Sequence, residues 1–426
     1  MAPAAYRPRV LDLALDAMLP ALPAIAIEGA KAVGKTESAR RRARSVHSLD
    51  DPEQRGLAEA DPHRLLTTPP PVLLDEWQHV PAVWDAVRRA VDAGAPPGRF
   101  LLTGSASPTS PGTHSGAGRI VSLRLRPMSF DERAVGQGST VSLGELLRGR
   151  RAAIDGQTSV DLVAYTREIL RSGFPGIRDL PERGRRAQLE GYLHRIVDRD
   201  FEDLGHPVRR PDALRRWMTA YAAATATTTT FEKIRDAAGS DGETPAKTTA
   251  SAHRDVLERL FIIDPVPGWQ PSRSHIARLT LPPKHHLADP ALAAQLLGVD
   301  ERRLLEGEAA GPPVPRDGTL LGALFESLAT LSIRVYAQAR EARVGHLRTK
   351  TGAREVDLIV ERPDGRVVAI EVKLAATPRE RDVRNLAWLA GELGENLLDA
   401  AVITTGRVAY RREDGIAVVP LALLGP

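Results

Sequence analysis

The stretch that decides the fold is AIAIEGAKAVGKT, residues 24–36. Its last eight residues, Gly29–Thr36, fit the pattern G-x-x-x-x-G-K-[ST] and follow the apolar run Ala24–Ile27, as a phosphate-binding loop follows a buried strand. Glycine suits the two fixed glycine positions because the backbone must approach an anion closely there, often at positive φ. The residues after the loop favour a helix whose positive N-terminal end faces the same anion. The sequence therefore predicts a strand, loop and helix that hold phosphate.

Each residue of this loop has an expected task. The backbone N–H groups would surround the phosphates, Lys35 would reach the β- and γ-phosphates, and the Thr36 hydroxyl would help to hold Mg²⁺. An eight-residue pattern also occurs in ordinary surface turns, so further elements are needed to support the assignment. The candidate phosphate-binding residues are Gly29, Ala30, Lys31, Ala32, Val33, Gly34, Lys35, Thr36 and Glu37.

Two further strands are expected downstream, and both end in polar residues. The apolar run Pro71–Leu74 ends in Asp75 and Glu76, as a Walker B strand does where it feeds a site at its carboxyl end. Asp75 would lie beside Mg²⁺, and Glu76 would polarise the attacking water. The run Arg99–Thr103 leads to Ser105, whose hydroxyl would lie near a γ-phosphate. Singly, these groups also suit a solvated strand end or a turn; their order after the loop favours one site.

With these motifs in order, the chain resembles prokaryotic AAA-type ATPases. More narrowly, it is similar to a large group that joins such an ATPase to a winged-helix region and a C-terminal nuclease-like domain. The chain has Ala30–Ala32 where this group usually has proline, arginine and glutamine, so no role of that arginine carries over. The motifs that carry the resemblance are Gly29–Thr36, Leu74–Gln78, Leu102–Ser105, Ala117–Arg119, Pro127–Glu132, Gly173–Pro175, Arg199–Asp200, Arg354–Asp357 and Glu371–Lys373.

The resemblance implies ATP as the ligand, Mg²⁺ as its metal ion and ATP hydrolysis as the reaction. The expected fold class is α/β: a P-loop NTPase parallel sheet, then a helical lid and winged-helix region, then a restriction-endonuclease-like α/β domain. The expected domains are 1–135 for the ATPase, 136–205 for the lid-like region, 206–300 for the winged helix and 301–426 for the nuclease-like domain.

Arg119 is a candidate arginine finger because it follows a loop rich in Ser, Thr, Gly and Pro over the expected nucleotide. It would act in cis or across a subunit boundary. An ordinary surface arginine at a strand start is the alternative. The sequence fixes neither the oligomeric state nor the source of any arginine finger.

Residues 231–263 predict a winged-helix succession: a helix over Phe231–Ala238, a turn at Gly239–Gly242, a second helix ending at Leu260, and a wing strand over Phe261–Ile263. Small polar and basic side chains on the second helix suit phosphates and base edges of DNA or RNA. Many winged helices contact only proteins, so a protein partner is the alternative. The expected recognition residues are Lys247, Thr248, Thr249, Ser251, His253 and Arg254.

Near the C-terminus, Glu355–Glu361 and Arg366–Lys373 alternate as strands around the turn Pro363–Gly365. This turn suits a type I turn followed by a left-handed glycine, which is a three-residue hairpin connection. That connection predicts that Arg362 lies opposite Arg366.

Counting outward from the turn sets Asp357 opposite Glu371 and Glu355 opposite Lys373, with all four side chains on one face. Two carboxylates and a lysine can hold a divalent metal ion and polarise a water for phosphodiester attack. The set resembles the D…E-x-K core of restriction-type nucleases, with Asp357 and Glu371 as metal ligands, Lys373 as a catalytic residue and Glu326 as a fourth member. Cross-strand ion pairs on an exposed face are the alternative.

Composition limits the remaining possibilities. The chain has 426 residues, of which 42% are hydrophobic and 26% charged, as in a soluble protein of several domains. A net charge of +4 permits nucleic-acid binding without requiring it, and the lack of cysteine excludes disulfides, thiol catalysis and cysteine-bound zinc. Asp12, Asp16 and Pro20 interrupt the N-terminal apolar segment, so we expect a cytoplasmic protein with no membrane partner. His285 and His286 are expected to be structural.

Two functions agree with these motifs. One is an ATP-gated, metal-dependent nuclease. The other is a nucleotide-dependent switch that binds DNA or a protein and whose nuclease-like domain does not cleave. A remodeller directed only at proteins is a third possibility. Neither the substrate nor the biological pathway follows from the sequence.

Overall fold

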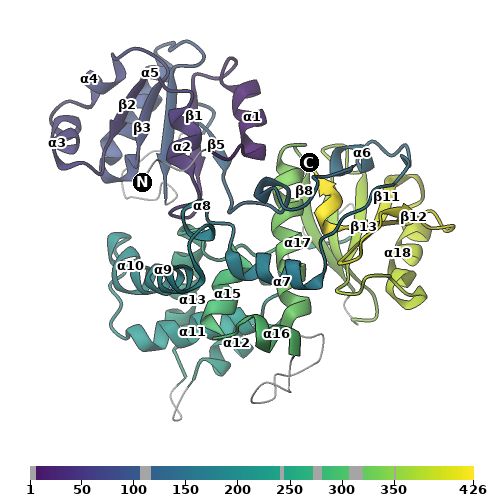
Figure 1. The fold of residues 1–426 in the computed structure, drawn as a ribbon. Coiled ribbons are helices and arrows are strands. Elements are labelled where there is room, and N and C mark those ends of the chain that lie inside the picture. Colours follow the sequence, from purple (N-terminus) through teal and green to yellow (C-terminus); the bar gives the residue numbers. More distant parts are fainter. Residues whose placement is uncertain (1–5, 106–116, 240–243, 272–280, 307–319, 350–351) are drawn as a thin grey trace. The chain divides into compact units, whose positions relative to one another are not determined.

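The computed structural model describes residues 6–105, 117–239, 244–271, 281–306, 320–349 and 352–426, which fold as two compact units (Figure 1). Unit 1 is Met1–Pro127 together with Leu257–Ile262, and unit 2 is Met128–Val256 together with Ile263–Pro426. Each unit has a sheet of its own and a hydrophobic core of its own.

Unit 1 is built around a five-stranded sheet in the order β2-β3-β4-β1-β5, with every pair parallel. The three strands expected from the sequence are confirmed as β1, β3 and β4. Their buried, apolar residues suit a parallel sheet that helices cover on both faces. The elements are α1 (Val10–Met18), β1 (Ala24–Glu28), α2 (Lys35–Arg40), β2 (Ser45–Ser48), α3 (Pro52–Ala60), α4 (Pro62–Leu66), β3 (Val72–Asp75), α5 (Pro81–Asp92), β4 (Phe100–Gly104) and β5 (Val121–Arg124).

One face of this sheet carries a hydrophobic core. The rings of Trp77 and Trp84 are tilted toward each other with centroids 4.6 Å apart, and they pack on alternate strand residues such as Leu74 and Leu102. Helix α2 packs against β1, β3 and β4, so its first residues lie at the carboxyl ends of those strands. Parallel strands direct their carboxyl ends to one edge, and this edge therefore collects the loop after β1 and the polar ends of β3 and β4.

Unit 2 begins with a helical part, which contains the two helices expected for a winged helix. The expected turn between them lies largely outside the described residues. The expected wing strand over Phe261–Ile263 is wrong: Ile263 and Val266 form isolated bridges with Leu287 and Lys284 instead. The helices are α6 (Leu143–Leu146), α7 (Leu162–Arg171), α8 (Pro175–Arg178), α9 (Glu182–Arg195), α10 (Phe201–Asp203), α11 (Pro211–Ala223), α12 (Phe231–Ala237), α13 (Lys247–Arg259), α15 (Pro290–Leu296) and α16 (Glu301–Glu306).

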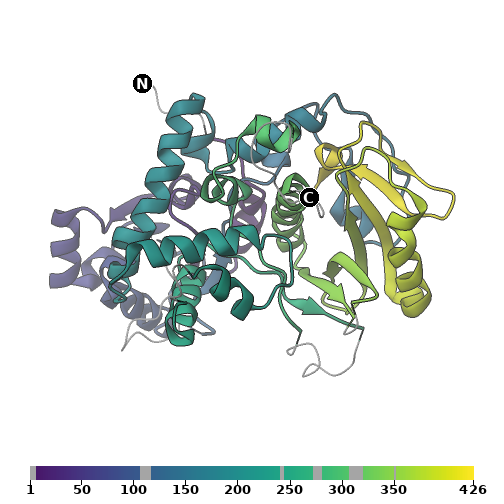
Figure 2. The same ribbon diagram turned by 90° about the horizontal axis from the view of Figure 1, so that it is seen from below.

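The rest of unit 2 is a mixed seven-stranded sheet in the order β12-β13-β11-β10-β9-β8-β7. Strand β9 is antiparallel to both neighbours, whereas β10, β11 and β13 run parallel. Helices α17 (Leu320–Gln338) and α18 (Glu380–Leu393) lie on opposite faces of the sheet (Figure 2). The strands are β7 (Gly268–Trp269), β8 (Arg343–Arg348), β9 (Glu355–Glu361), β10 (Val367–Val372), β11 (Leu397–Thr404), β12 (Tyr410–Arg411) and β13 (Ala417–Pro420).

The hairpin of β9 and β10 has the expected register. Val367 pairs with Glu361 and Ile370 with Leu358, and the Arg362 N–H donates to the carbonyl oxygen of Arg366 at 2.9 Å. This is the register in which Asp357 lies opposite Glu371, so the prediction for the hairpin is confirmed.

A short pair of parallel strands joins the segment after residue 136 to the last residues of the chain. Strand β6 (Val141–Ser142) pairs with β14 (Leu424–Gly425), and Gln157 bridges to Val408. The first part of the expected lid-like region therefore packs with the C-terminal part inside unit 2.

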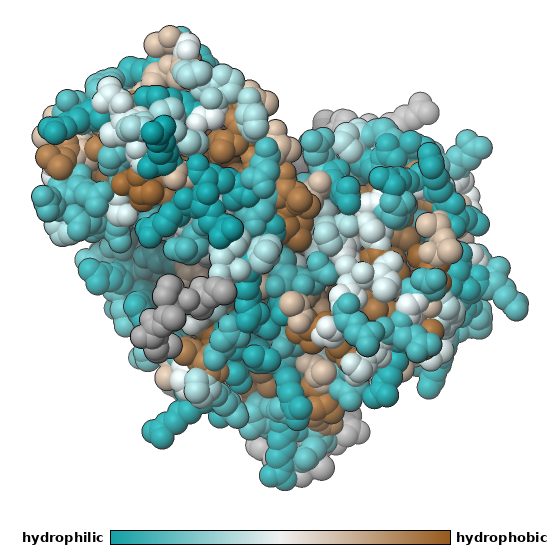
Figure 3. Space-filling view, turned by 45° about the horizontal axis from the view of Figure 1, so that its top comes forward, coloured by the Kyte–Doolittle hydropathy of each residue, from teal (hydrophilic) through white to brown (hydrophobic). Residues whose placement is uncertain are grey.

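The surface drawn in Figure 3 is largely hydrophilic, with hydrophobic residues in small separate areas. Large exposed hydrophobic side chains within the described residues are Leu13, Leu57, Val121 and Val408, which lie on different elements. Among the described helices, α17 has the length and composition of a membrane span, but 67% of that stretch is buried inside the protein. Helix α17 is therefore a core helix of unit 2.

Candidate functional site

The loop between β1 and α2 has backbone conformations that suit glycine. Gly34 has a φ of 100° and Gly29 a φ of 155°. A Cβ atom at Gly29 would lie 2.1 Å from the carbonyl oxygen of Leu125, so no larger residue fits there. The loop thus passes close to other backbone at one end and turns sharply into α2 at the other.

Lys35 is the first residue of α2 and is 4% exposed. Its Nζ donates to the carbonyl oxygens of Gly29 at 2.9 Å and Ala30 at 3.0 Å, so the ammonium group lies inside the curve of the loop. Burial lowers the pKa of Lys35 to about 8, although the carboxylates of Glu76 and Asp75 act to raise it.

Asp75 is held at the end of β3 by two hydroxyl groups. The Thr36 Oγ1 donates to Asp75 Oδ1 at 2.8 Å, and the Thr103 hydroxyl donates to the same oxygen. Thr103 reaches Asp75 because β4 lies directly beside β3 in the sheet. Burial raises the pKa of Asp75 above its ordinary value. The structure thus brings together Thr36 and Asp75, the two residues expected to serve Mg²⁺.

Glu76 and Ser105 are also brought together. The Ser105 hydroxyl donates to Glu76 Oε2 at 3.0 Å, and Gln78 Nε2 donates to Ser105 Oγ at 3.1 Å and also bonds to Glu76. Glu76 has a φ of 52°, a left-handed conformation that costs a non-glycine residue about 1 kcal/mol or more. Strained positions of this kind cluster at functional sites, where the surrounding contacts hold them.

Three residues of this region had no role in the sequence interpretation. Gln78 and Thr103 lie within the quoted motifs, next to the acidic residues in sequence or on the neighbouring strand. Their polar side chains could therefore have indicated that they contact Glu76 and Asp75. Arg9 gave no signal, because its partners are distant in the chain. It is 5% exposed, and its guanidinium donates to the carbonyl oxygens of Val33 and Arg126, both at 2.7 Å.

The structure does not bring Arg119 to the phosphate loop of its own unit. Val121 pairs with Ile25 at the start of β1, so Arg119 lies at the amino ends of the strands, whereas the loop lies at their carboxyl ends. Arg119 is about half exposed and pairs with Asp92 at 2.8 Å. The cis contact expected for an arginine finger is therefore absent between these described residues. The expected mobile loop before it lies mostly outside the described residues.

The second group expected from the sequence lies in unit 2, at the ends of β9 and β10. Lys373 Nζ lies 2.6 Å from Glu371 Oε2 and 3.4 Å from Asp357 Oδ2. The backbone N–H of Val372 donates to Asp357 Oδ2 at 2.9 Å. The hairpin thus gathers Asp357, Glu371 and Lys373, and all but Lys373 are more than 90% buried.

Lys284 is the residue of this cluster that sequence reasoning missed. It is 1% exposed, and its Nζ lies 2.8 Å from Glu326, 3.0 Å from Asp357 and 3.3 Å from Glu355. Lys284 forms an isolated β-bridge with Val266, and this long-range pairing brings it to the cluster. No sequence motif around Lys284 could have predicted that position. We call Lys284, Glu326, Glu355, Asp357, Glu371 and Lys373 the charge cluster.

The electrostatics of the charge cluster follow from burial and from the two ammonium groups. Burial alone would raise the pKa of Asp357, but Lys284 and Lys373 hold it well below its ordinary value. Burial and the nearby charge of Asp357 raise the pKa of Glu326 to about 7 and that of Glu371 well above its usual range. Within the part of the chain that the structure describes, no group of three His, Cys, Asp or Glu residues is arranged to hold a metal ion.

The two histidines beside Lys284 are buried, as expected. His285 Nε2 contacts the carbonyl oxygen of Thr229 at 2.6 Å, and burial lowers the pKa of His286 well below its ordinary value. Both rings are held within the core of unit 2.

Comparison with known families adds to the geometry of unit 1. Residues 22–134 match the family described as "AAA domain", and they contain the loop, Asp75, Glu76 and Ser105. Unit 1 carries a P-loop AAA-type ATPase domain. Residues 163–303 and 321–424 of the chain match two families described as domains of unknown function, DUF8612 and DUF4143. The expectations of a winged helix and of a nuclease-like fold find no support in these matches.

Individual relatives are distant from this ATPase. Uncharacterized protein Rv2008c of Mycobacterium tuberculosis and uncharacterized protein Mb2031c of Mycobacterium bovis are each 25% identical over 355 residues, which cover 82% of this chain and 68% of theirs. The Walker-type ATPase PABY2304 of Pyrococcus abyssi is similar over 68% of this chain and 96% of its own, with a TM-score of 0.40 and 15% identity. That similarity is too low to decide fold or function.

Proposed function

We propose that this chain binds ATP with Mg²⁺ and hydrolyses it at the loop of unit 1. The observation that carries the proposal is the buried ammonium group of Lys35 inside a glycine loop, at the same sheet edge as Asp75 and Glu76. An ammonium group and a row of backbone N–H groups favour a polyphosphate at this edge.

Mg²⁺ fits the residues of this site. Thr36 and Asp75 offer hydroxyl and carboxylate oxygens, the ligand types that Mg²⁺ prefers, and their side chains are already in contact at 2.8 Å. When bound with ATP, the ion would neutralise charge on the phosphates. The loop residues Gly29–Glu37 would position the phosphates through backbone N–H groups.

Glu76 is the proposed base that polarises the attacking water, and Ser105 and Gln78 are proposed to orient it. Their hydrogen bonds to Glu76 support this assignment, because a base must be held in one orientation to act on a positioned water. Arg119 lies far from this group of its own unit, so its proposed role as an arginine finger requires a second copy of the chain.

The test is nucleotide binding and turnover by two variants. Lys35→Ala should lose affinity for ATP because the buried ammonium group is gone. Glu76→Gln should bind ATP as the wild type does but hydrolyse it about 100-fold or more slowly, as expected when a general base is removed. Gln54→Ala, on α3, is a matched control with both properties unchanged. Equal affinity in the wild type and the Lys35 variant would contradict the assignment.

For the C-terminal part, we propose a switch element without nuclease activity, and the charge cluster supports this choice over cleavage. A metal ion at Asp357 and Glu371 would need carboxylate lone pairs that Lys284, Lys373 and the Val372 N–H now occupy. Displacing Lys284 from Asp357 would take one of its three carboxylate partners from a buried ammonium group, which is costly. The nuclease-like fold itself remains our hypothesis from the sequence.

Cleavage and ATP turnover in one tube separate the two functions. The wild-type chain with ATP and Mg²⁺ or Mn²⁺ should leave linear DNA and RNA intact, and any nucleotide-dependent gel shift should persist in Asp357→Ala. Metal-dependent cleavage that Asp357→Ala abolishes would establish the nuclease instead. ATP turnover that does not change with nucleic acid would favour a protein partner.

A cytoplasmic location is part of this proposal.

A further inference from the structure

Unit 2 contains a pocket between helices α11 and α13, and three of the expected recognition residues, Thr248, Thr249 and His253, line it. Its volume is about 670 Å³, within the range of small-molecule sites. Both helices begin at this pocket: Arg209 and Arg210 precede α11, and Thr248 and Thr249 lie in the first turn of α13. We call it the α11–α13 pocket.

The charge of the α11–α13 pocket is one-sided. Arg209, Arg210 and Arg216 line it, and no Asp or Glu is found among its described lining residues. Neither Arg209 nor Arg216 forms an ion pair with any described carboxylate; Arg216 donates only to the carbonyl oxygen of Ala238, at 3.4 Å. Guanidinium groups without a carboxylate partner attract an anion with little competition.

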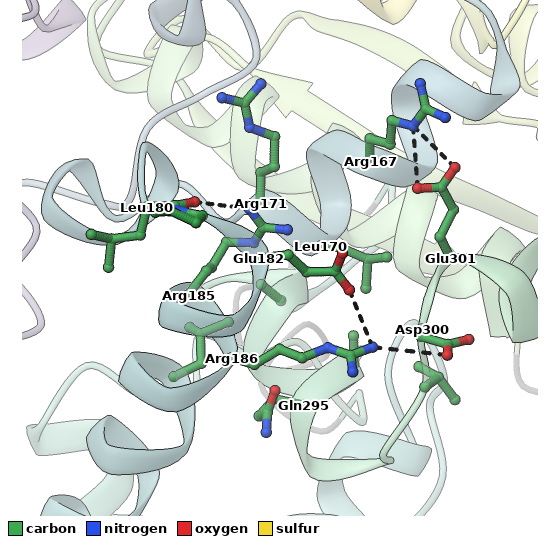
Figure 4. A pocket seen from close by; sticks show the side chains of 15 residues that line it. Arg167, Leu170, Arg171, Leu180, Glu182, Arg185, Arg186, Gln295, Asp300 and Glu301 are labelled. Atoms are coloured by element: carbon green, nitrogen blue, oxygen red, sulfur yellow. Dashed lines mark hydrogen bonds and ion pairs between the residues drawn. The ribbon is translucent and has the colours of Figure 1, made fainter.

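Another pocket of unit 2 shows the contrast (Figure 4). It is also rich in arginine, but Arg167 bonds to Glu301 at 3.0 Å, and Arg186 lies between Glu182 at 3.6 Å and Asp300 at 3.8 Å. An anion entering that pocket would have to displace carboxylates from Arg167 and Arg186, whereas Arg185 donates to the carbonyl oxygen of Leu180. In the α11–α13 pocket, Arg209 and Arg216 form no ion pair with a described carboxylate, although Arg216 also lines a neighbouring hollow with Asp212 and Glu190.

His253 lines the α11–α13 pocket, and its Nδ1 atom is buried without a hydrogen-bond partner among the described residues. Its ring packs edge-on against Phe201 and Trp217. The Nδ1 atom itself is enclosed by protein, so the ring contributes to the wall of the pocket and does not present this atom to a ligand.

The shape of the α11–α13 pocket argues for a compact ligand rather than duplex DNA. A recognition helix must protrude to enter a DNA groove, whereas here the first turns of α13 line a hollow. Phe201, Val208 and Val256 give the hollow apolar walls beside the arginines. Basic groups beside apolar walls suit a phosphate joined to an aromatic or apolar part.

We propose that the α11–α13 pocket binds a nucleotide-sized organic phosphate, at a site separate from the ATP site of unit 1. Arg209 and Arg216 bind the phosphate, with the Thr248 and Thr249 hydroxyls beside it, and the His253 ring forms part of the wall. The site is thus suited to a phosphorylated effector of the ATPase.

The test counts bound nucleotide in four forms of the full chain by calorimetric titration with ADP. The wild type should bind two equivalents, Lys35→Ala one, and the double variant Arg209→Gln with Arg216→Gln one, because each change removes a different site. The triple variant should bind none. Arg235→Gln, on α12 and paired with Asp236, is the matched control and should behave as the wild type.

The outcomes separate this inference from the ATP site. Equal stoichiometry in the wild type and the Arg209 and Arg216 variant, with unchanged melting temperatures, overturns the inference and leaves the ATP site untouched. Equal stoichiometry in the wild type and Lys35→Ala contradicts the ATP site instead.

Inorganic pyrophosphate should bind the pocket about 10-fold or more weakly than ADP if the apolar walls contribute. Loss of duplex DNA binding in the arginine variant, without loss of ADP binding, assigns the pocket to DNA and overturns the proposal.

Discussion

The ammonium group of Lys35 lies between the carbonyl oxygens of Gly29 and Ala30, with burial lowering its pKa to about 8. A bound polyphosphate favours the charged form, so binding must take up a proton wherever the free protein has lost it. The affinity for ATP should stay constant below pH 8 and fall by up to about tenfold per pH unit above it.

This pH dependence is measured by titration calorimetry from pH 6.5 to 9.5 in two buffers of different ionisation enthalpy. Proton uptake should be near zero at pH 6.5 and rise above pH 8. Lys35→Arg removes the titration, because arginine stays protonated throughout this range. A constant ATP affinity and no proton uptake up to pH 9.5 would show that Lys35 does not contact the phosphates.

Lys284 presents the opposite case, a buried lysine whose charge is held by three carboxylates. Burial would lower the pKa of Lys284, but Asp357 and Glu326 raise it above its ordinary value, so the lysine is charged in the folded protein. Lys284→Met should cost about 3 to 5 kcal/mol of the free energy of unfolding, because Glu326 and Asp357 lose their buried partner. Chemical denaturation of unit 2 measures this loss.

Two comparisons make that prediction sharp. Lys233→Met, at an exposed position of α12, should change the free energy of unfolding by less than about 0.5 kcal/mol. Lys284→Met combined with Glu326→Gln should cost less free energy of unfolding than the sum of the single changes. Each single change leaves one buried charge without its partner, whereas the double change removes both charges of the pair. A loss below about 1 kcal/mol in Lys284→Met would mean that the charge cluster does not depend on it.

At the scale of elements, the β9–β10 hairpin shows what local sequence can determine. Its turn fixes the register because only three residues join the strands, and Gly365 has the positive φ of 83° that ends such a turn. Gly365→Ala should destabilise unit 2 by about 1 kcal/mol through backbone strain alone, since a Cβ there meets no other atom.

Gly391 in α18 is the matched control for that change. It also has open space around it, but it lies in a helix, where alanine is favoured by about 0.5 to 1 kcal/mol. Gly391→Ala should therefore stabilise the chain, and Gly365→Ala should destabilise it. If the two changes had equal effects on the denaturation midpoint, Gly365 would not have the positive φ on which this turn depends.

The same comparison explains which parts of the sites could be predicted. The loop Gly29–Thr36, the ends of β3 and β4 and the hairpin register follow from runs of fewer than about twenty residues, in which spacing decides geometry. Lys284 meets Asp357 across 73 positions of the chain, and Arg9 meets Arg126 across 117. No local pattern encodes such contacts, because they depend on how whole elements pack.

The cis role of Arg119 and the wing strand fail for a related reason. The cis role was considered because Arg119 follows the loop expected over the nucleotide, but the pairing of β5 with β1 places Arg119 at the opposite edge of the sheet. Phe261–Ile263 has the composition of a strand, yet Phe261 lies in a turn at a φ of 58°, and Ile263 forms only an isolated bridge with Leu287. Tertiary context decided both positions over local propensity.

At the scale of the whole molecule, the two units have separate cores, and only unit 1 carries the ATP site. A ligand stabilises only the unit that binds it, by RT ln(1 + [L]/Kd), which is about 2.7 kcal/mol at a hundredfold excess over Kd. Calorimetric unfolding should therefore show two transitions, of which saturating ATP with Mg²⁺ raises that of unit 1 through the site of Lys35, while any nucleotide bound in the α11–α13 pocket raises that of unit 2. Lys35→Ala should remove the shift of the unit 1 transition, while Lys284→Met lowers the unit 2 transition. A single transition whose melting temperature changes in both variants would mean that the two units unfold together. Nucleotide binding to one unit would then stabilise the whole chain.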